Sequence, residues 1–155
     1  IKIRDMLNVG CVSYIGNFIG TASLSLLFIG SGSSREEMVV YYNNMITEKL
    51  SATPTELLLR GILCNFLVCL AVWTGIRMKT ESGKLIVMFC IIMTFVVAGF
   101  EHSIANMSIF TLAAFLCDSL SGMAVLQNLA LVTIGNVIGG AVLLAVPLKL
   151  MSWHK

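Results

Sequence analysis

Two adjacent ionisable residues, Glu101 and His102, interrupt a long apolar stretch of this sequence. Ionisable side chains are costly inside a membrane span, usually face the protein interior, and mark ion or proton pathways. A histidine there can donate a hydrogen bond to an anion or give it a proton near neutral pH, while the glutamate orients the imidazole or holds the backbone. The alternative is that the pair only forms hydrogen bonds between helices. Their position in a helix break favours the functional interpretation.

The composition indicates a membrane protein. Of the 155 residues, 57% are hydrophobic and 12% are charged, whereas soluble domains carry about 25% charged residues. The net charge of +2 and the lack of a basic cluster with aromatic residues argue against a nucleic-acid partner. The five cysteines are odd in number and show no C-x-x-C spacing, so we expect buried, unpaired thiols and neither a metal site nor a cofactor.

Four apolar stretches are long enough to cross a membrane, at about residues 9–29, 57–76, 85–116 and 123–150. The third has 32 residues, and one straight helix of that length would measure about 48 Å against a hydrocarbon core of about 30 Å. Gly99 and three polar residues lie near its middle. The sequence therefore predicts an all-α fold with a helix broken at residues 99–103. Irregular backbone at that depth indicates a pore, and the helix ends would direct their dipoles towards an anion there.

The first and last stretches contain a repeat. Residues 15–24 read IGNFIGTASL and residues 134–143 read IGNVIGGAVL, with seven of ten positions identical. Because the two copies lie three spans apart, they cross the membrane in opposite directions. This predicts an inverted repeat of three-span units, an arrangement typical of transporters. If the last three spans form one unit, the first span ends the other unit and two spans are missing before Ile1.

The basic residues predict the orientation, because cytoplasmic loops near span ends are enriched in Lys and Arg. Seven lie on one side of the predicted membrane and two on the other, with Arg60 just inside the second span. The seven are Lys2, Arg4, Arg77, Lys79, Lys84, Lys149 and Lys155, and the two are Arg35 and Lys49. Both chain ends are therefore expected in the cytoplasm.

Other polar and aromatic residues have two interpretations each. Asn65 could reach the pore or form an interhelical hydrogen bond, and packing is at least as good an explanation for Asn17, Asn106 and Asn136. Lys49 could attract anions to an outer vestibule or simply be solvated. Phe95 could form a constriction that excludes hydrated ions, or belong to the core.

Several motifs together resemble the formate/nitrite transporter family. Residues 100–107 read FEHSIANM, residues 61–73 read GILCNFLVCLAVW, and the two IGN-containing stretches lie on either side. The similarity extends over the whole chain and corresponds to the last four of the family's six helices. It implies an aquaporin-like protomer in a homopentamer, each protomer with its own pore for formate, nitrite, hydrosulfide or a similar anion.

The resemblance also implies roles for particular residues. His102 matches the central pore histidine, Asn65 the asparagine near it, Glu101 the adjoining glutamate, Lys49 the outer vestibule lysine and Phe95 the constriction aromatic. In the family's mechanism the anion is drawn towards the lysine, meets the histidine between two hydrophobic constrictions, and crosses with a proton as the neutral acid.

We expect residues 1–155 to form a single transmembrane domain, the C-terminal portion of a channel in a bacterial inner membrane. The missing helices of the same protein would then be required for activity, and the protein would not be an enzyme. A rival interpretation is a membrane subunit of a redox complex, but only His102 lies in the membrane, so a single chain cannot ligate haem through two histidines. A purely structural membrane protein is the third interpretation. The sequence does not select among the anions.

Overall fold

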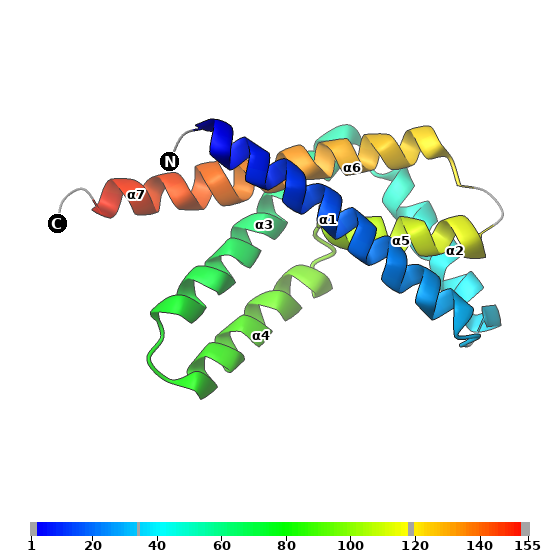
Figure 1. Ribbon diagram of the computed structural model, residues 1–155, viewed down its shortest axis with the longest axis horizontal. Coiled ribbons are helices and arrows are strands. Elements are labelled where there is room, and N and C mark those ends of the chain that lie inside the picture. Colours follow the sequence, from blue (N-terminus) through cyan, green and yellow to red (C-terminus); the bar gives the residue numbers. More distant parts are fainter. Residues whose placement is uncertain (1–2, 34, 118–119, 153–155) are drawn as a thin grey trace. The chain divides into compact units, whose positions relative to one another are not determined.

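The computed structural model describes residues 3–33, 35–117 and 120–152, and within these ranges all regular structure is helical. In chain order the elements are α1 (Ile3–Gly30), α2 (Arg35–Ser51), α3 (Pro54–Arg77), α4 (Glu81–Val97), α5 (Ser103–Leu116), α6 (Gly122–Val137), the π-helix η1 (Ile138–Ala145) and α7 (Val146–Ser152) (Figure 1). The predicted all-α fold is confirmed.

Within the described part of the chain, three helical stretches are long and apolar enough to cross a membrane. They cover Arg4–Gly30, Pro54–Arg77 and Gly122–Ser152, the last formed by α6, η1 and α7 together. By contrast, α4 has 17 residues and α5 has 14, which gives lengths of about 26 Å and about 21 Å, each shorter than a hydrocarbon core of about 30 Å. The predicted break in the third span is confirmed, since α4 ends at Val97 and α5 begins at Ser103.

The chain divides into two compact units. The first contains Ile1–Ser51 and Ile104–Leu126. Within it, the Ser25 hydroxyl on α1 lies 3.1 Å from the Ser108 hydroxyl on α5. Its buried apolar residues are Ile46, Met107, Phe110, Leu112 and Ala113.

The second unit contains Ala52–Ser103 and Gln127–Lys155, and α3 is its central helix. A capping box begins α3: the Thr53 hydroxyl accepts the Glu56 backbone N–H, and the Glu56 carboxylate accepts the Thr53 N–H at 2.8 Å. Pro54 fits the first helical turn, where its missing N–H has no helical partner. α3 then packs against α4 in a hairpin and against η1 (Figure 1).

Glycines let α3 and the last span approach until their backbones touch. A Cβ atom on Gly135 would lie 2.5 Å from the Leu58 carbonyl oxygen, and one on Gly61 would lie 2.9 Å from the Val132 carbonyl oxygen. On Gly139 it would overlap the Ile62 carbonyl oxygen. Gly135 and Gly139 belong to the second copy of the repeat, and the helix that they approach is α3.

Two elements were not predicted. The polar interval between the first two spans contains α2, and the last span contains the π-helical segment η1. The expectation of buried thiols holds for Cys64 and is wrong for Cys11 and Cys90, which are exposed on the single chain.

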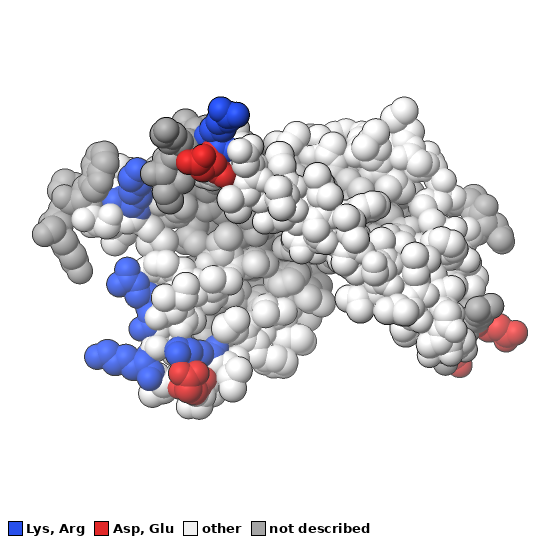
Figure 2. All heavy atoms as spheres, viewed as in Figure 1, with Lys and Arg blue, Asp and Glu red and all other residues white. Residues whose placement is uncertain are grey.

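Charged side chains lie at the ends of the α3–α4 hairpin. Figure 2 shows blue and red spheres over its connection and white spheres along its flanks. Arg77 ends α3, and Lys84 in the first turn of α4 pairs with Glu81 at 2.6 Å. The flanks are therefore apolar surface of the kind that spans present to lipid.

Candidate pore site

The candidate site lies where α4 ends, and its backbone is held by a Schellman motif. The Gly99 N–H donates to the Val96 carbonyl at 3.1 Å, and the Phe100 N–H donates to the Phe95 carbonyl at 3.1 Å. Gly99 has φ +66°, a left-handed conformation that other residues adopt only at a cost. The helix is therefore ended by specific bonds at the residues that the sequence predicted.

Beyond Gly99 the link is tied to α3 and to the last span. The Glu101 N–H donates to the Arg60 carbonyl on α3 at 3.4 Å. The Asn136 amide nitrogen donates to the Glu101 carbonyl at 3.0 Å and to the Gly61 carbonyl at 2.8 Å. The Asn136 side-chain oxygen accepts the Ser103 N–H at 3.0 Å. One buried side chain thus satisfies backbone groups on three segments, groups that would otherwise be costly to bury.

Asn65 lies on α3 beside this junction. Its amide nitrogen donates to the Asn136 carbonyl oxygen at 2.6 Å, and its side-chain oxygen lies 3.7 Å from the Cys69 sulfur. The interhelical hydrogen bond that the sequence analysis allowed is present. Asn65 reaches the junction through the main chain of Asn136.

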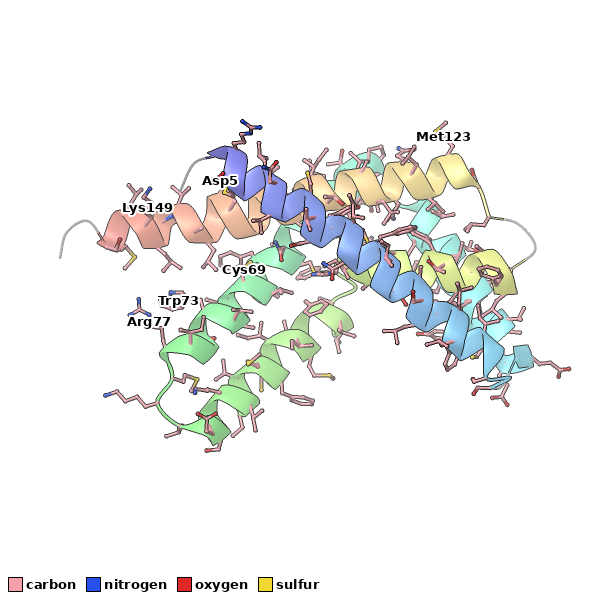
Figure 3. The ribbon with its side chains drawn as sticks, in the orientation of Figure 1. Asp5, Cys69, Trp73, Arg77, Met123 and Lys149 are labelled. Carbon is pink, nitrogen blue, oxygen red and sulfur yellow. The ribbon has the colours of Figure 1, made fainter. Side chains whose placement is uncertain are left out.

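A row of side chains at four-residue spacing continues along α3 from Asn65. Cys69, Trp73 and Arg77 follow one another towards the end of the helix (Figure 3), because residues four apart lie on the same face. The Arg77 guanidinium carbon lies 5.6 Å from the centre of a Trp73 ring, a cation–π contact. The row connects the junction with the basic end of α3.

The two ionisable residues of the link differ in exposure. Glu101 is 2% exposed, whereas His102 is partly exposed. The centres of the Phe95 and His102 rings are 6.4 Å apart, with 34° between the ring planes. Phe95, Glu101, His102 and Asn65 all belong to the second unit, and their roles at a pore remain predictions.

The structure limits one further expectation, about the helix ends at the break, and does not test another, about Lys49. The helix ends at the break were expected to direct their dipoles towards an anion, and the Ser103 N–H at the start of α5 is not available for this because it donates to Asn136. Lys49 lies in the last turn of α2, in the other unit, partly exposed. Its vestibule role remains a prediction from sequence.

Asn136 is the residue whose importance the sequence did not reveal. It was expected to form a hydrogen bond between helices, without a partner. The available signal was the repeated IGN motif, in which an amide in an apolar helix occurs twice beside glycines.

A family model described as Formate/nitrite transporter matches residues 1–150. The chain is 36% identical over 147 residues to the uncharacterized transporter YwcJ of Bacillus subtilis, covering 93% of this chain and 57% of that protein. It is 35% identical over 133 residues to the nitrite transporter NirC of Salmonella typhimurium, covering 84% and 49%. The chain thus spans about half the length of the curated relatives it matches.

Solved structures give the same result. An FNT family ion channel matches with a TM-score of 0.86 and 30% identity, over 97% of this chain and 61% of that one. A structure described as a pentameric formate channel with formate bound matches with a TM-score of 0.82 and 26% identity, over 96% and 67%.

The apolar helices and the aquaporin-like helical fold define a multi-pass membrane protein of the channel and transporter class. The chain belongs to the formate/nitrite transporter family.

Proposed function

We propose that the whole protein conducts small monovalent anions, such as formate, nitrite or hydrosulfide, across a bacterial inner membrane, and that it is not an enzyme. The observation that supports this most strongly is the broken third span, with a buried glutamate and a partly exposed histidine at its break. Membrane proteins tolerate such backbone and such side chains where they line a solute pathway. Relatives named as nitrite transporter and formate channel support the anion class.

In this proposal His102 meets the solute. Its imidazole donates a hydrogen bond to the anion or transfers a proton to it, so the solute crosses as the neutral acid. Glu101 and Asn65 hold in place the link that carries His102 and the helices beside it. Phe95 forms part of the constriction, because its ring lies beside the His102 ring in an apolar setting.

We further propose that Lys49 draws anions to an outer vestibule, helped by Arg60. The Arg60 side chain is partly exposed and its guanidinium lies 3.8 Å from the Glu56 carboxylate. The distribution of basic residues supports placing both chain ends in the cytoplasm. A homopentamer is proposed from the solved relative described as pentameric.

Residues 1–155 are proposed to be one transmembrane domain that needs two preceding helices of the same protein for activity. Expressing this segment alone should give no anion flux in liposomes. Full flux from the segment alone would contradict this part of the proposal.

The central test uses the full-length protein in liposomes. Flux of formate, nitrite and hydrosulfide is measured across pH for the wild type and for His102→Gln, which can form hydrogen bonds but cannot titrate in this range. We expect the wild type to carry at least one of these anions faster at lower pH, and the variant to lose this pH dependence. His154→Gln is the control, since the sequence places that histidine at the chain end. Unchanged flux and pH dependence in His102→Gln would leave only a structural role.

A further inference from the structure

The connection between α3 and α4 carries positive charges at the end of a membrane span. Because α3 is long and apolar enough to cross a membrane, its last residue, Arg77, lies at a membrane surface. Lys79 follows two residues later, and Figure 2 shows blue spheres gathered over this connection. Lys84 is already paired with Glu81 at 2.6 Å. Within the described ranges the ion pairs include neither Arg77 nor Lys79, so both charges can act on another molecule.

The packing of the connection turns these two cations outward. A Cβ atom on Gly83 would lie 2.7 Å from the end of the Met78 side chain and 2.6 Å from the Thr80 hydroxyl oxygen, so both side chains lie against the start of α4. Met78 and Thr80 have extended backbone, with ψ 142° and 134°. Successive side chains of an extended segment point to opposite sides. Arg77 and Lys79 therefore point away from α4, and both are exposed.

Trp73 holds the Arg77 side chain in place. The guanidinium carbon lies 5.6 Å from the centre of the Trp73 ring, and Figure 3 shows the two side chains side by side on α3. A basic side chain at a helix end often binds the last carbonyls, but here the Met78 N–H donates to the Thr74 carbonyl. Tryptophan is enriched where a span meets the lipid headgroups. The cation–π contact therefore holds the guanidinium at headgroup level, and a stacked guanidinium still has N–H donors for a phosphate.

Apolar side chains lie next to these cations, on the membrane side of the connection. Ile76 at the end of α3 is 77% exposed, and Leu85 and Ile86 in the first turns of α4 are 70% and 63% exposed on the single chain. The two helices are packed together here, since a Cβ atom on Gly75 would lie 3.3 Å from the Met88 sulfur. Fixed positive charges thus lie directly beside apolar surface. A phospholipid has the complementary order of groups, a negative phosphate followed by acyl chains.

We propose that the α3–α4 connection binds the headgroup of an anionic phospholipid, with Arg77 and Lys79 on its phosphate and the acyl chains along the hairpin. Guanidinium N–H groups match phosphate oxygens in pairs, and an ammonium adds a point charge. Basic residues next to a span recognise anionic lipids in this way. A zwitterionic headgroup fits less well, because it brings its own cation to the same place. The inference goes beyond the proposed function, since it concerns the surrounding lipid and not the solute that is carried.

Photocrosslinking locates the lipid on the full-length protein without measuring flux. Phosphatidylglycerol with a photoreactive headgroup is added to the protein in phosphatidylcholine nanodiscs, and mass spectrometry identifies the labelled peptides. We expect labelling within residues 73–89, and we expect unlabelled phosphatidylglycerol to compete for it. Labelling that spares this segment would overturn the proposal. Equal competition by added phosphatidylcholine would do so as well, and competition by inorganic phosphate alone would show a site for a free ion instead of a lipid.

Substitutions provide a second measurement, the affinity for phosphatidylglycerol in native mass spectrometry of the full-length protein. Replacing Arg77 and Lys79 together by glutamine should weaken binding by about tenfold or more. Trp73→Leu keeps every charge and should weaken it by about threefold, through loss of the cation–π contact.

The matched control replaces Glu81 and Lys84 together by glutamine. This pair also loses a cation from the connection but leaves the net charge unchanged, so we expect little change in affinity. An equal loss of affinity in the control and in the Arg77 and Lys79 variant would overturn the assigned headgroup contact. The crosslink in the wild type does not depend on whether any variant folds. A protein that carried no anion at all could still give it, so this proposal and the proposed function can fail separately.

Discussion

The Asn136 side-chain oxygen accepts the Ser103 backbone N–H at 3.0 Å, although 33 residues separate the two in the chain. The amide nitrogen of the same side chain donates to Gly61 and to Glu101, 75 and 35 residues away. The break in the third span is therefore part of a network with α3 and α6. Its geometry depends on one amide that is 6% exposed.

Replacing Asn136 by aspartate should destabilise the protein severely. A carboxylate accepts but cannot donate, so the Gly61 and Glu101 carbonyls would lose their partner and face a negative charge. Each buried group left unsatisfied costs about 1–3 kcal/mol. Thermal unfolding of the full-length protein in detergent measures the effect. Asn44→Asp on α2, an exposed position, is the matched control and should shift the melting temperature little. Equal stability of the two variants would refute the assigned network.

Adding one methyl group at Gly139 should force α3 and the last span apart. The new Cβ would overlap the Ile62 carbonyl, a backbone atom that cannot rotate away. Overpacking of this kind costs about 1–3 kcal/mol. Gly122→Ala is the control, since a Cβ there meets nothing within 4 Å in the described structure. Denaturation curves should show a lower free energy of unfolding for Gly139→Ala and little change for Gly122→Ala.

Substitutions at Gly99 should lower stability through backbone conformation alone. Its φ is +66°, and a Cβ built there meets nothing within 4 Å among the described residues. Gly99→Ala should therefore cost about 1 kcal/mol through strain, and Gly99→Asn should cost less, because asparagine adopts left-handed conformations more readily. Melting temperatures of both variants give the order. The same loss in both would argue against strain as the cause.

Phe95 should affect selectivity more than stability. Its ring centre lies 6.4 Å from that of His102, so truncating it should widen the passage at the proposed site. We expect Phe95→Ala to admit anions larger than nitrite in liposome flux assays, while Phe95→Leu retains most of the discrimination. Phe89→Ala is a suitable control, because Phe89 is 65% exposed on the single chain. Wider permeation in that control alone would show that the constriction had been misplaced.

The sequence predicted those parts of the fold that depend on local composition. The break was predictable because Gly99 and the polar residues after it interrupt a stretch too long for one span. The repeat predicted that Asn17 and Asn136 are equivalent. The partners of Asn136 could not be predicted, since its bonds join residues far apart in the chain and local periodicity contains no information about them.

The helix α2 was missed for a different reason. Its 17 residues include charged and amide side chains, so α2 does not stand out as an apolar stretch. The segment was therefore interpreted as a connection between two spans. Apolar residues at helical spacing, such as Met38, Tyr42 and Ile46, were the available signal, and Ile46 is indeed 5% exposed. The position of Lys49 relative to His102 depends on how distant segments pack, which one sequence does not specify.

The contact between α3 and α6 has a consequence for how the family can diverge. Main-chain atoms meet there, and their spacing is set by peptide geometry whichever rotamers the surrounding residues adopt. We therefore expect substitutions at lipid-facing positions to leave the distance between these two helices unaltered.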